Sequence, residues 1–154
     1  MQGVNPVVKT GLKQVADTEG ISPYNYACRY ALKNAISGTE TQVELDYSKI
    51  ILSEGGLSRI AALTAVKEDE NIKFSWSDSV ENSVGSLTDT VVLVVYNVSN
   101  GELCYSSGEV HRSAKTATLP IPYSVSGDKL LFYLFFQSAT NATLVSTSQY
   151  LGSV

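Results

Sequence analysis

The chain has 154 residues, 44% of them hydrophobic and 17% charged, with a formal net charge of −4 at pH 7. This composition is typical of a single globular domain that buries its own core, and the lack of a basic run argues against nucleic acid as a partner. No stretch reaches the roughly 18 apolar residues of a membrane span and the first residues lack a signal-peptide pattern, so we expect a soluble protein of undetermined compartment.

Helical spacing marks the first part of the chain. Ser22 is a good N-cap, Pro23 suits the first helical position and Gly38 is a typical C-terminal stop. Between them, apolar and small side chains recur every three or four positions, at Tyr24, Ala27, Cys28, Ala31, Leu32, Ala35 and Ile36. The pattern predicts an amphipathic helix from Tyr24 to Ile36 with one buried face. The preceding segment PVVKTGLKQVA predicts a shorter helix, which Gly11 weakens by about 1 kcal/mol relative to alanine.

The hydrophobic pattern then changes from helical to extended. The segment VELDYSKIIL is β-branched and partly alternating, which predicts an extended arm or strand, and the turn SEGGL ends it. We therefore divide the chain into an N-terminal helical segment at residues 1–42, an extended arm or strand at 43–58 and a β-sandwich domain at 59–154.

Seven short runs of strand character follow, each bounded by Gly, Asn, Asp, Ser or Pro. In chain order they are IAALTAVK, NIKFSWS, TVVLVVYN, ELCYSS, KTATLPIP, KLLFYLFFQS and LVSTSQYLG. Seven strands over about 95 residues predict an antiparallel sandwich of the immunoglobulin or fibronectin type III kind. In the second run Ile72, Phe74 and Trp76 share one face, and we predict Trp76 at the centre of the core.

Two of these runs, Val91 to Tyr96 and Leu130 to Phe136, are apolar on both faces. Strands of antiparallel sheets usually carry polar side chains on the solvent face, so the outer face of these strands should be covered. The third and sixth strands of such a sandwich are neighbours, and the two runs would form one outer patch. Either the helix from Tyr24 to Ile36 covers this patch, or a protein partner or a second copy in a homo-oligomer does.

Catalytic chemistry finds little support in the sequence. His111 is the single histidine and lies in EVHRSAK without a nucleophile motif nearby, which favours a surface histidine. Glu68, Asp69 and Glu70 fall between two predicted strands and fit a solvated hairpin turn better than a calcium loop. Glycine-rich phosphate loops are absent from the sequence. We therefore expect no enzyme, and we assign no catalytic, cofactor-binding or metal-binding residue.

The two cysteines, Cys28 and Cys104, are too few for a disulfide scaffold and lack the spacing of a zinc site. Free cysteine often packs as a small hydrophobic residue. Two separate, buried thiols are therefore the favoured interpretation, and a single long-range disulfide is the alternative.

Several strings have a specific order and spacing: YNYACRYALKNAISG, LDYSKIILSEGGL, FSWSD, DTVVLVVYN and SQYLGSV. Over nearly the whole chain they resemble the C-terminal portion of a Bacteroidota family designated domain of unknown function 6266. The resemblance implies no known activity. It implies that relatives carry a further N-terminal region rich in Gly, Lys and Arg. More loosely, FSW looks like the tryptophan-bearing second strand of fibronectin type III domains, an analogy that bears on fold and not on function.

The leading functional hypothesis is a non-catalytic structural or interaction module, for example a component of a surface or phage-type assembly. The alternative is a module that binds a glycan or a peptide through loop tyrosines, because tyrosine provides amphipathic contact area at low entropic cost. Its candidate residues are Tyr24, Tyr26, Tyr105 and Tyr123.

Overall fold

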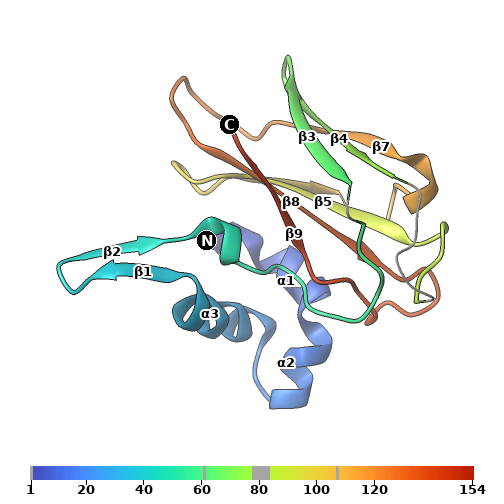
Figure 1. Ribbon diagram of the computed structural model, residues 1–154, viewed down its shortest axis with the longest axis horizontal. Coiled ribbons are helices and arrows are strands. Elements are labelled where there is room, and N and C mark those ends of the chain that lie inside the picture. The colour runs from blue at the N-terminus through green and yellow to red at the C-terminus, as the bar shows by residue number, and fades with distance from the viewer. Residues whose placement is uncertain (1, 61, 78–83, 107) are drawn as a thin grey trace.

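Two antiparallel β-sheets stack face to face, and three α-helices lie against the outer side of one of them (Figure 1). The computed structural model describes residues 2–60, 62–77, 84–106 and 108–154. Within these ranges it contains nine strands and three α-helices, so the fold is mainly β as predicted, with two strands beyond the predicted seven.

The N-terminal helices follow local sequence signals. A 3-10 turn, η1 (Gln2–Val4), leads into α1 (Asn5–Gly11), α2 (Lys13–Glu19) and α3 (Pro23–Asn34). The Ser22 hydroxyl oxygen accepts a hydrogen bond from the Asn25 backbone N–H, and Pro23 opens α3. The predicted N-terminus of the main helix is therefore confirmed.

The predicted stop signal Gly38 belongs to a hairpin instead. α3 ends at Asn34, and strands β1 (Ile36–Thr39) and β2 (Gln42–Leu45) follow as an antiparallel pair. Gly38 has a φ of +103°, and a Cβ atom there would collide with the carbonyl oxygen of Gln42. The glycine permits the close approach of the two strands, so the prediction that it ends the helix is wrong.

The weakly predicted first helix is present as two short helices that meet at Leu12, which is fully buried. Gly11 closes α1 at a point where its backbone packs directly on the backbone of residues 52–53, and an added Cβ atom would collide with the carbonyl oxygen of Leu52. The glycine that lowers helix propensity is thus required by packing.

The seven predicted runs each contain one strand. One sheet has the order β3-β4-β7, with β3 (Leu63–Glu68), β4 (Asn71–Trp76) and β7 (Thr116–Pro120). The other has the order β6-β5-β8-β9, with β5 (Thr90–Asn97), β6 (Leu103–Ser106), β8 (Leu130–Gln137) and β9 (Gln149–Ser153). The 3-10 turns η2 (Tyr47–Lys49) and η3 (Arg112–Ala114) lie in the connections. β5 pairs with β8 over its whole length, which confirms that the third and sixth of the seven runs are neighbours.

The core between the two sheets is built as the alternation predicts. One face of β4 meets the inner face of β5 and β8, and the buried side chains include Ile72, Phe74, Val91, Leu93, Val95, Phe132, Leu134 and Phe136. Trp76 lies in this core, its ring edge-on to Phe136 with centroids 6.4 Å apart, and its indole N–H donates to the Arg112 carbonyl oxygen at 2.7 Å. The prediction that Trp76 is a core residue is confirmed, but Trp76 is the last residue of β4 and lies near Arg112 rather than at the centre of the core.

The outer faces of β5 and β8 are also buried, as their apolar pattern predicted. A second core gathers Val92, Val94, Tyr96, Leu131, Tyr133 and Phe135 from these strands. The cover comes mainly from α1 with the residues that flank it, and from the segment 50–52; together they contribute Val4, Val7, Val8, Leu12, Ile50, Ile51 and Leu52. α3 has no fully buried residue and adds only partly buried side chains. The cover therefore belongs to the chain itself, but the predicted helix is its minor part.

This packing corrects the location that we predicted for a partner. The sheet that carries Val91–Tyr96 and Leu130–Phe136 leaves no apolar outer patch, because every residue of both runs is buried by the chain itself. Any apolar surface for a partner must lie elsewhere. Among the described residues, no helix combines the length and apolar character needed to cross a bilayer.

Candidate functional site

The titratable residues examined in the sequence do not converge on a reactive centre. His111 lies on the surface just before η3, with Nδ1 2.9 Å from the Thr88 carbonyl oxygen. Asp69 adopts a φ of +53° in the turn between β3 and β4, and Glu68 lies 4.0 Å from Lys73 across that hairpin. In the described ranges, no three His, Cys, Asp or Glu side chains are placed to hold a metal ion.

Arg112 is the most deeply buried charged residue near His111. Its guanidinium donates to the Ser58 carbonyl oxygen at 2.7 Å, lies 3.6 Å from the Asp89 carboxylate and covers the Phe136 ring at 3.9 Å. Burial lowers the pKa of Arg112, and the charge of Asp89 partly offsets this effect. These contacts tie the segment before β3 and the turn before β5 to one end of the core, which is a structural role.

Both cysteines are free thiols, so the separate-thiol interpretation is confirmed over the disulfide. Their predicted burial is only partly right. Cys104 is half-buried on β6, where burial raises the pKa of its thiol, whereas Cys28 is exposed on α3. Cys28 lines an apolar groove beside α3, which leaves its thiol open to solvent.

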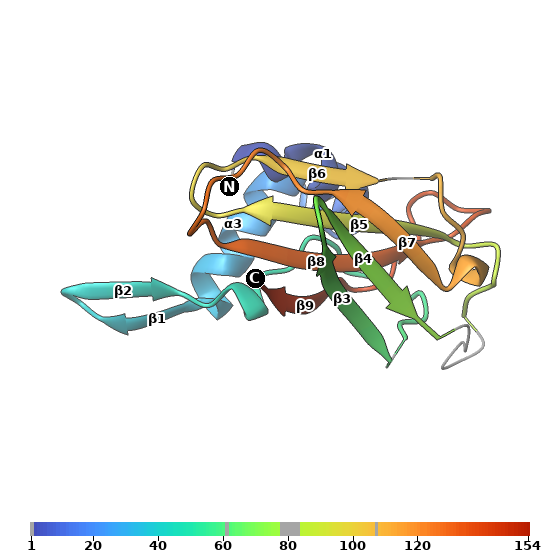
Figure 2. The ribbon, with the colours of Figure 1, turned by 90° about the horizontal axis from the view of Figure 1, so that it is seen from above.

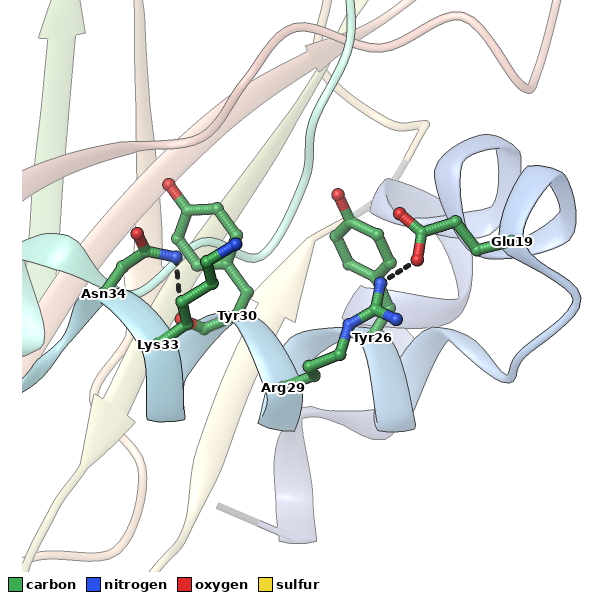
Figure 3. Close-up of a pocket in the computed structure, with 6 residues that line it drawn as sticks. All are labelled: Glu19, Tyr26, Arg29, Tyr30, Lys33 and Asn34. Atoms are coloured by element: carbon green, nitrogen blue, oxygen red, sulfur yellow. Dashed lines mark hydrogen bonds and ion pairs between the residues drawn. The ribbon is translucent and has the colours of Figure 1, made fainter.

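A polar pocket of about 560 Å³ lies along one side of α3 (Figure 3). Its lining residues are Glu19, Tyr26, Arg29, Tyr30, Lys33 and Asn34. The Tyr26 hydroxyl donates to the Glu54 carboxylate at 2.6 Å, and this bond raises the pKa of Tyr26 to about 12. Arg29 pairs with Glu19 and lies 5.4 Å from the Tyr26 ring centroid. The pocket thus offers two tyrosine rings flanked by cationic and amide groups.

An apolar groove of about 360 Å³ runs along the opposite side of α3. It is lined by Val4, Val8, Tyr24, Ala27, Cys28, Ala31, Leu32, Ile36, Leu45, Ile50, Ile51 and Leu52. Only part of the predicted apolar face of the helix is therefore buried. Ala27 and Ala31 pack toward the second core, but Leu32 stays 72% exposed. Short side chains allow the close approach of the helix, and the large one is left in water.

The β1–β2 hairpin projects away from the body of the molecule (Figure 2), and its base residues Ile36 and Leu45 line the groove. Ile36 at its base is 42% exposed and Val43 on β2 is 65% exposed. The hairpin was not predicted, because the helical spacing extends to Ile36 and Gly38 resembles a helix stop. The signal was present, since β-branched Ile36, Thr39 and Val43 flank a short polar turn.

The four tyrosines proposed for ligand binding do not form one site. Tyr24 lines the apolar groove and Tyr26 the polar pocket. Tyr123 is 75% exposed in a separate depression beside the β3–β4 turn, and Tyr105 lies on β6. The structure brings only Tyr24 and Tyr26 to the same helix, on two different sides.

Comparison with known proteins places the chain in a family and goes no further. No curated protein and no solved structure matches it. The family described as "Family of unknown function (DUF6266)" matches residues 1–152. The match spans nearly the whole chain and agrees with the resemblance noted in the sequence strings, so the chain belongs to this family of unknown function.

Proposed function

We propose that this protein is a non-catalytic interaction module whose binding surface is the apolar groove beside α3 together with the β1–β2 hairpin. The observation that carries the proposal is the exposure of Leu32 and Ile36 in the lining of an apolar groove, together with the exposure of Val43 on the hairpin that begins at Ile36. Contiguous apolar surface of this kind marks sites of interaction.

The energetic argument supports the same surface. Burying one Leu, Ile or Val side chain that is left in water is worth about 1.5–3 kcal/mol. Both faces of β5 and β8 are buried, whereas several apolar side chains elsewhere stay exposed, among them Leu87, Val125 and Val154. Leu32, Ile36 and Val43 differ from these in that they belong to consecutive elements, α3 and the β1–β2 hairpin, and a partner that covered them would recover this free energy.

The proposal is tested with the tagged chain as bait in an extract of the organism that encodes it. We expect retained proteins, including untagged copies of the chain, whose recovery is lost in Leu32→Asp and Val43→Asp. Val66→Asp is the matched control, because Val66 is a strand valine with 54% exposure on β3, outside the groove. Recovery of the same proteins by wild type and Leu32→Asp would contradict the proposal.

We further propose that the β-domain is of the fibronectin type III kind. In support, the first, second and fifth of the seven strands form one sheet, β3-β4-β7, and the remaining four form the other. The fourth strand, β6, pairs with the third, β5, whereas constant-type immunoglobulin domains place the fourth strand in the opposite sheet.

The wider setting that we propose is a surface or phage-type assembly in a member of the Bacteroidota. The sequence resemblance supports the source, and an exposed apolar surface on a chain with no assigned chemistry supports assembly. Genes for capsid, tail or secretion proteins beside this gene would strengthen the proposal, and a neighbourhood of metabolic genes would weaken it.

Binding of a glycan or a peptide in the polar pocket is the second candidate. The Tyr26 and Tyr30 rings project from the same side of α3, with Lys33 beside Tyr30 and Arg29 beside Tyr26 (Figure 3), and such amphipathic rings suit sugar or peptide ligands. Tyr30→Ala should abolish binding on a glycan or peptide array, with the exposed Tyr123→Ala as control. Arrays without any Tyr30-dependent signal would count against this candidate.

A further inference from the structure

We propose that the polar pocket beside α3 binds an acidic oligosaccharide, with the Tyr30 ring packed on a sugar ring and the Lys33 ammonium paired with a sugar carboxylate. This inference rests on the second candidate of the proposed function, because it names the chemical class of ligand for the same pocket. It is independent of the apolar groove, since the linings of the two sites share no residue.

Five of the lining residues follow one another along one side of α3. Tyr26, Arg29, Tyr30, Lys33 and Asn34 stand at i, i+3, i+4, i+7 and i+8, a spacing that places side chains on one helix face. The two rings are one turn apart, as are the two cations, which is about 6 Å along the axis. Figure 3 shows a cation beside each ring. The volume of about 560 Å³ lies within the usual range of ligand pockets.

The end of the pocket near Tyr26 is held by contacts within the chain. The Tyr26 hydroxyl donates to Glu54 at 2.6 Å, and Arg29 pairs with Glu19 while lying over the Tyr26 ring. The side chains of Arg29 and Glu19 are 54% and 42% exposed. Exposed ion pairs contribute little free energy, so a ligand carboxylate can replace Glu19 at small cost.

The other end of the pocket offers polar groups that the chain does not use. Within the part of the chain that the structure describes, Lys33 has no acidic partner and the Tyr30 hydroxyl has no hydrogen-bond partner. The Tyr30 ring is half-buried and packs in part on the second core, which limits its movement. The Asn34 amide N–H donates to the Tyr30 carbonyl oxygen at 3.0 Å, which leaves the amide oxygen as an acceptor. A cation, a flat ring and neutral donors and acceptors together suit a sugar acid.

The charge of the lining favours an anionic ligand. Arg29 and Lys33 are cationic and Glu19 is the one acid of the lining, whereas the whole chain has a net charge of −4. Glu54 lies outside the lining, where it accepts the Tyr26 hydroxyl. A carboxylate would pair with the excess positive charge, and a neutral sugar would leave it in water.

The elements that border the pocket favour a sugar over a peptide. Peptides commonly bind by adding a strand to a sheet edge, by placing a helix in an apolar groove or by presenting phosphate groups to clustered arginines. The lining residues all belong to α2 or α3, and they are polar or aromatic, so the lining supplies neither a strand edge nor an apolar groove. An acidic peptide is therefore the competing ligand that the experiment must separate.

The first experiment titrates the full chain with sugar hexamers by isothermal calorimetry. The ligands are hexamers of galacturonic, mannuronic and guluronic acid, each with its methyl ester as the uncharged control. We expect at least one acid to bind with a dissociation constant below about 1 mM and its ester at least about tenfold more weakly. Raising NaCl from about 50 mM to about 500 mM should weaken binding of the acid through screening. Hexaglutamate, a peptide of similar charge, should not bind.

The second experiment repeats the titration with substituted chains. Lys33→Gln should weaken binding of the acid about three- to tenfold, and Tyr30→Ala should abolish it. Lys13→Gln is the matched control and should change nothing, because Lys13 is an exposed helical lysine outside the pocket. Circular dichroism verifies the fold of each variant. Lys33 is exposed, so Lys33→Gln tests the inference even where loss of the half-buried Tyr30 ring unfolds the chain.

The third experiment removes the acid that competes with the ligand. Glu19→Gln frees Arg29 and should tighten binding of the acid about two- to fivefold. Asp17→Asn is its control, because it removes the same charge from the same helix outside the pocket. A general loss of negative charge would act alike in both variants, so a larger effect of Glu19→Gln requires a contact in the pocket.

The inference would be overturned if none of the acids bound below about 1 mM, if acid and ester bound equally, or if Lys33→Gln bound like the wild type. Binding of a neutral glycan or of hexaglutamate that depends on Tyr30 would overturn only the acidic sugar as ligand. The absence of any signal that depends on Tyr30 would overturn the second candidate as well. Neither result bears on the apolar groove, which Leu32→Asp tests separately.

Discussion

Replacing Phe135 by alanine tests whether the outer face of the β5–β8 pair is a true core. Phe135 and Phe132 lie on opposite faces of β8, and their exposed fractions are 0% and 1%. A buried Phe→Ala replacement costs about 3–5 kcal/mol from lost transfer free energy and the cavity left behind. Because both faces are packed, we expect the two variants to lose similar stability. If the outer face of the sheet were exposed to solvent, only Phe132→Ala on the inner face would lose this stability.

The assay is urea unfolding, followed by the fluorescence of Trp76, the single tryptophan, and by circular dichroism. With an m value of about 2 kcal/mol/M, each loss lowers the urea midpoint by roughly 1.5–2.5 M. The control is Tyr123→Ala at an exposed aromatic, which should change the free energy of unfolding by less than about 0.5 kcal/mol. If Phe135→Ala cost under about 1 kcal/mol while Phe132→Ala cost its full amount, the reasoning about the cover would be refuted.

Three further predictions follow from single contacts. Gly11→Ala should lower the melting temperature because its Cβ atom would collide with the backbone of residues 52–53, at a cost of about 1–3 kcal/mol. Gly56→Ala is the control, because an added Cβ atom there meets open space. A Gly11→Ala variant more stable than the wild type would contradict the packing. Because the pKa of Tyr26 is raised to about 12 from the ordinary 10.0, the folded state retains this proton while the unfolded chain loses it. The free energy of unfolding should therefore fall between these pH values, and an equally steep fall in Tyr26→Phe would refute this origin. A thiol reagent should label Cys28 quickly and Cys104 slowly, so a fast phase that survives in Cys28→Ser would be inconsistent with their exposures.

The sequence alone determined the elements whose signals are local. Ser22 and Pro23 fixed the start of α3 because capping involves only neighbouring residues. Alternation placed Trp76 in the core, and the apolar residues on both faces of β5 and β8 required a cover on both faces. Both conclusions follow because successive side chains of a strand point to opposite faces, so the spacing of apolar residues shows which faces are buried.

Only the tertiary structure decided what the cover is and which surface stays free. α1 and the segment 50–52 cover the outer sheet because Gly11 lets their backbones meet, a contact between positions some 40 residues apart that no periodicity encodes. With that place taken, α3 is displaced outward. Its apolar face then splits into buried alanines and an exposed Leu32 beside a projecting hairpin. The candidate site arises from this competition between two segments for one sheet face, and such competition depends on packing in three dimensions.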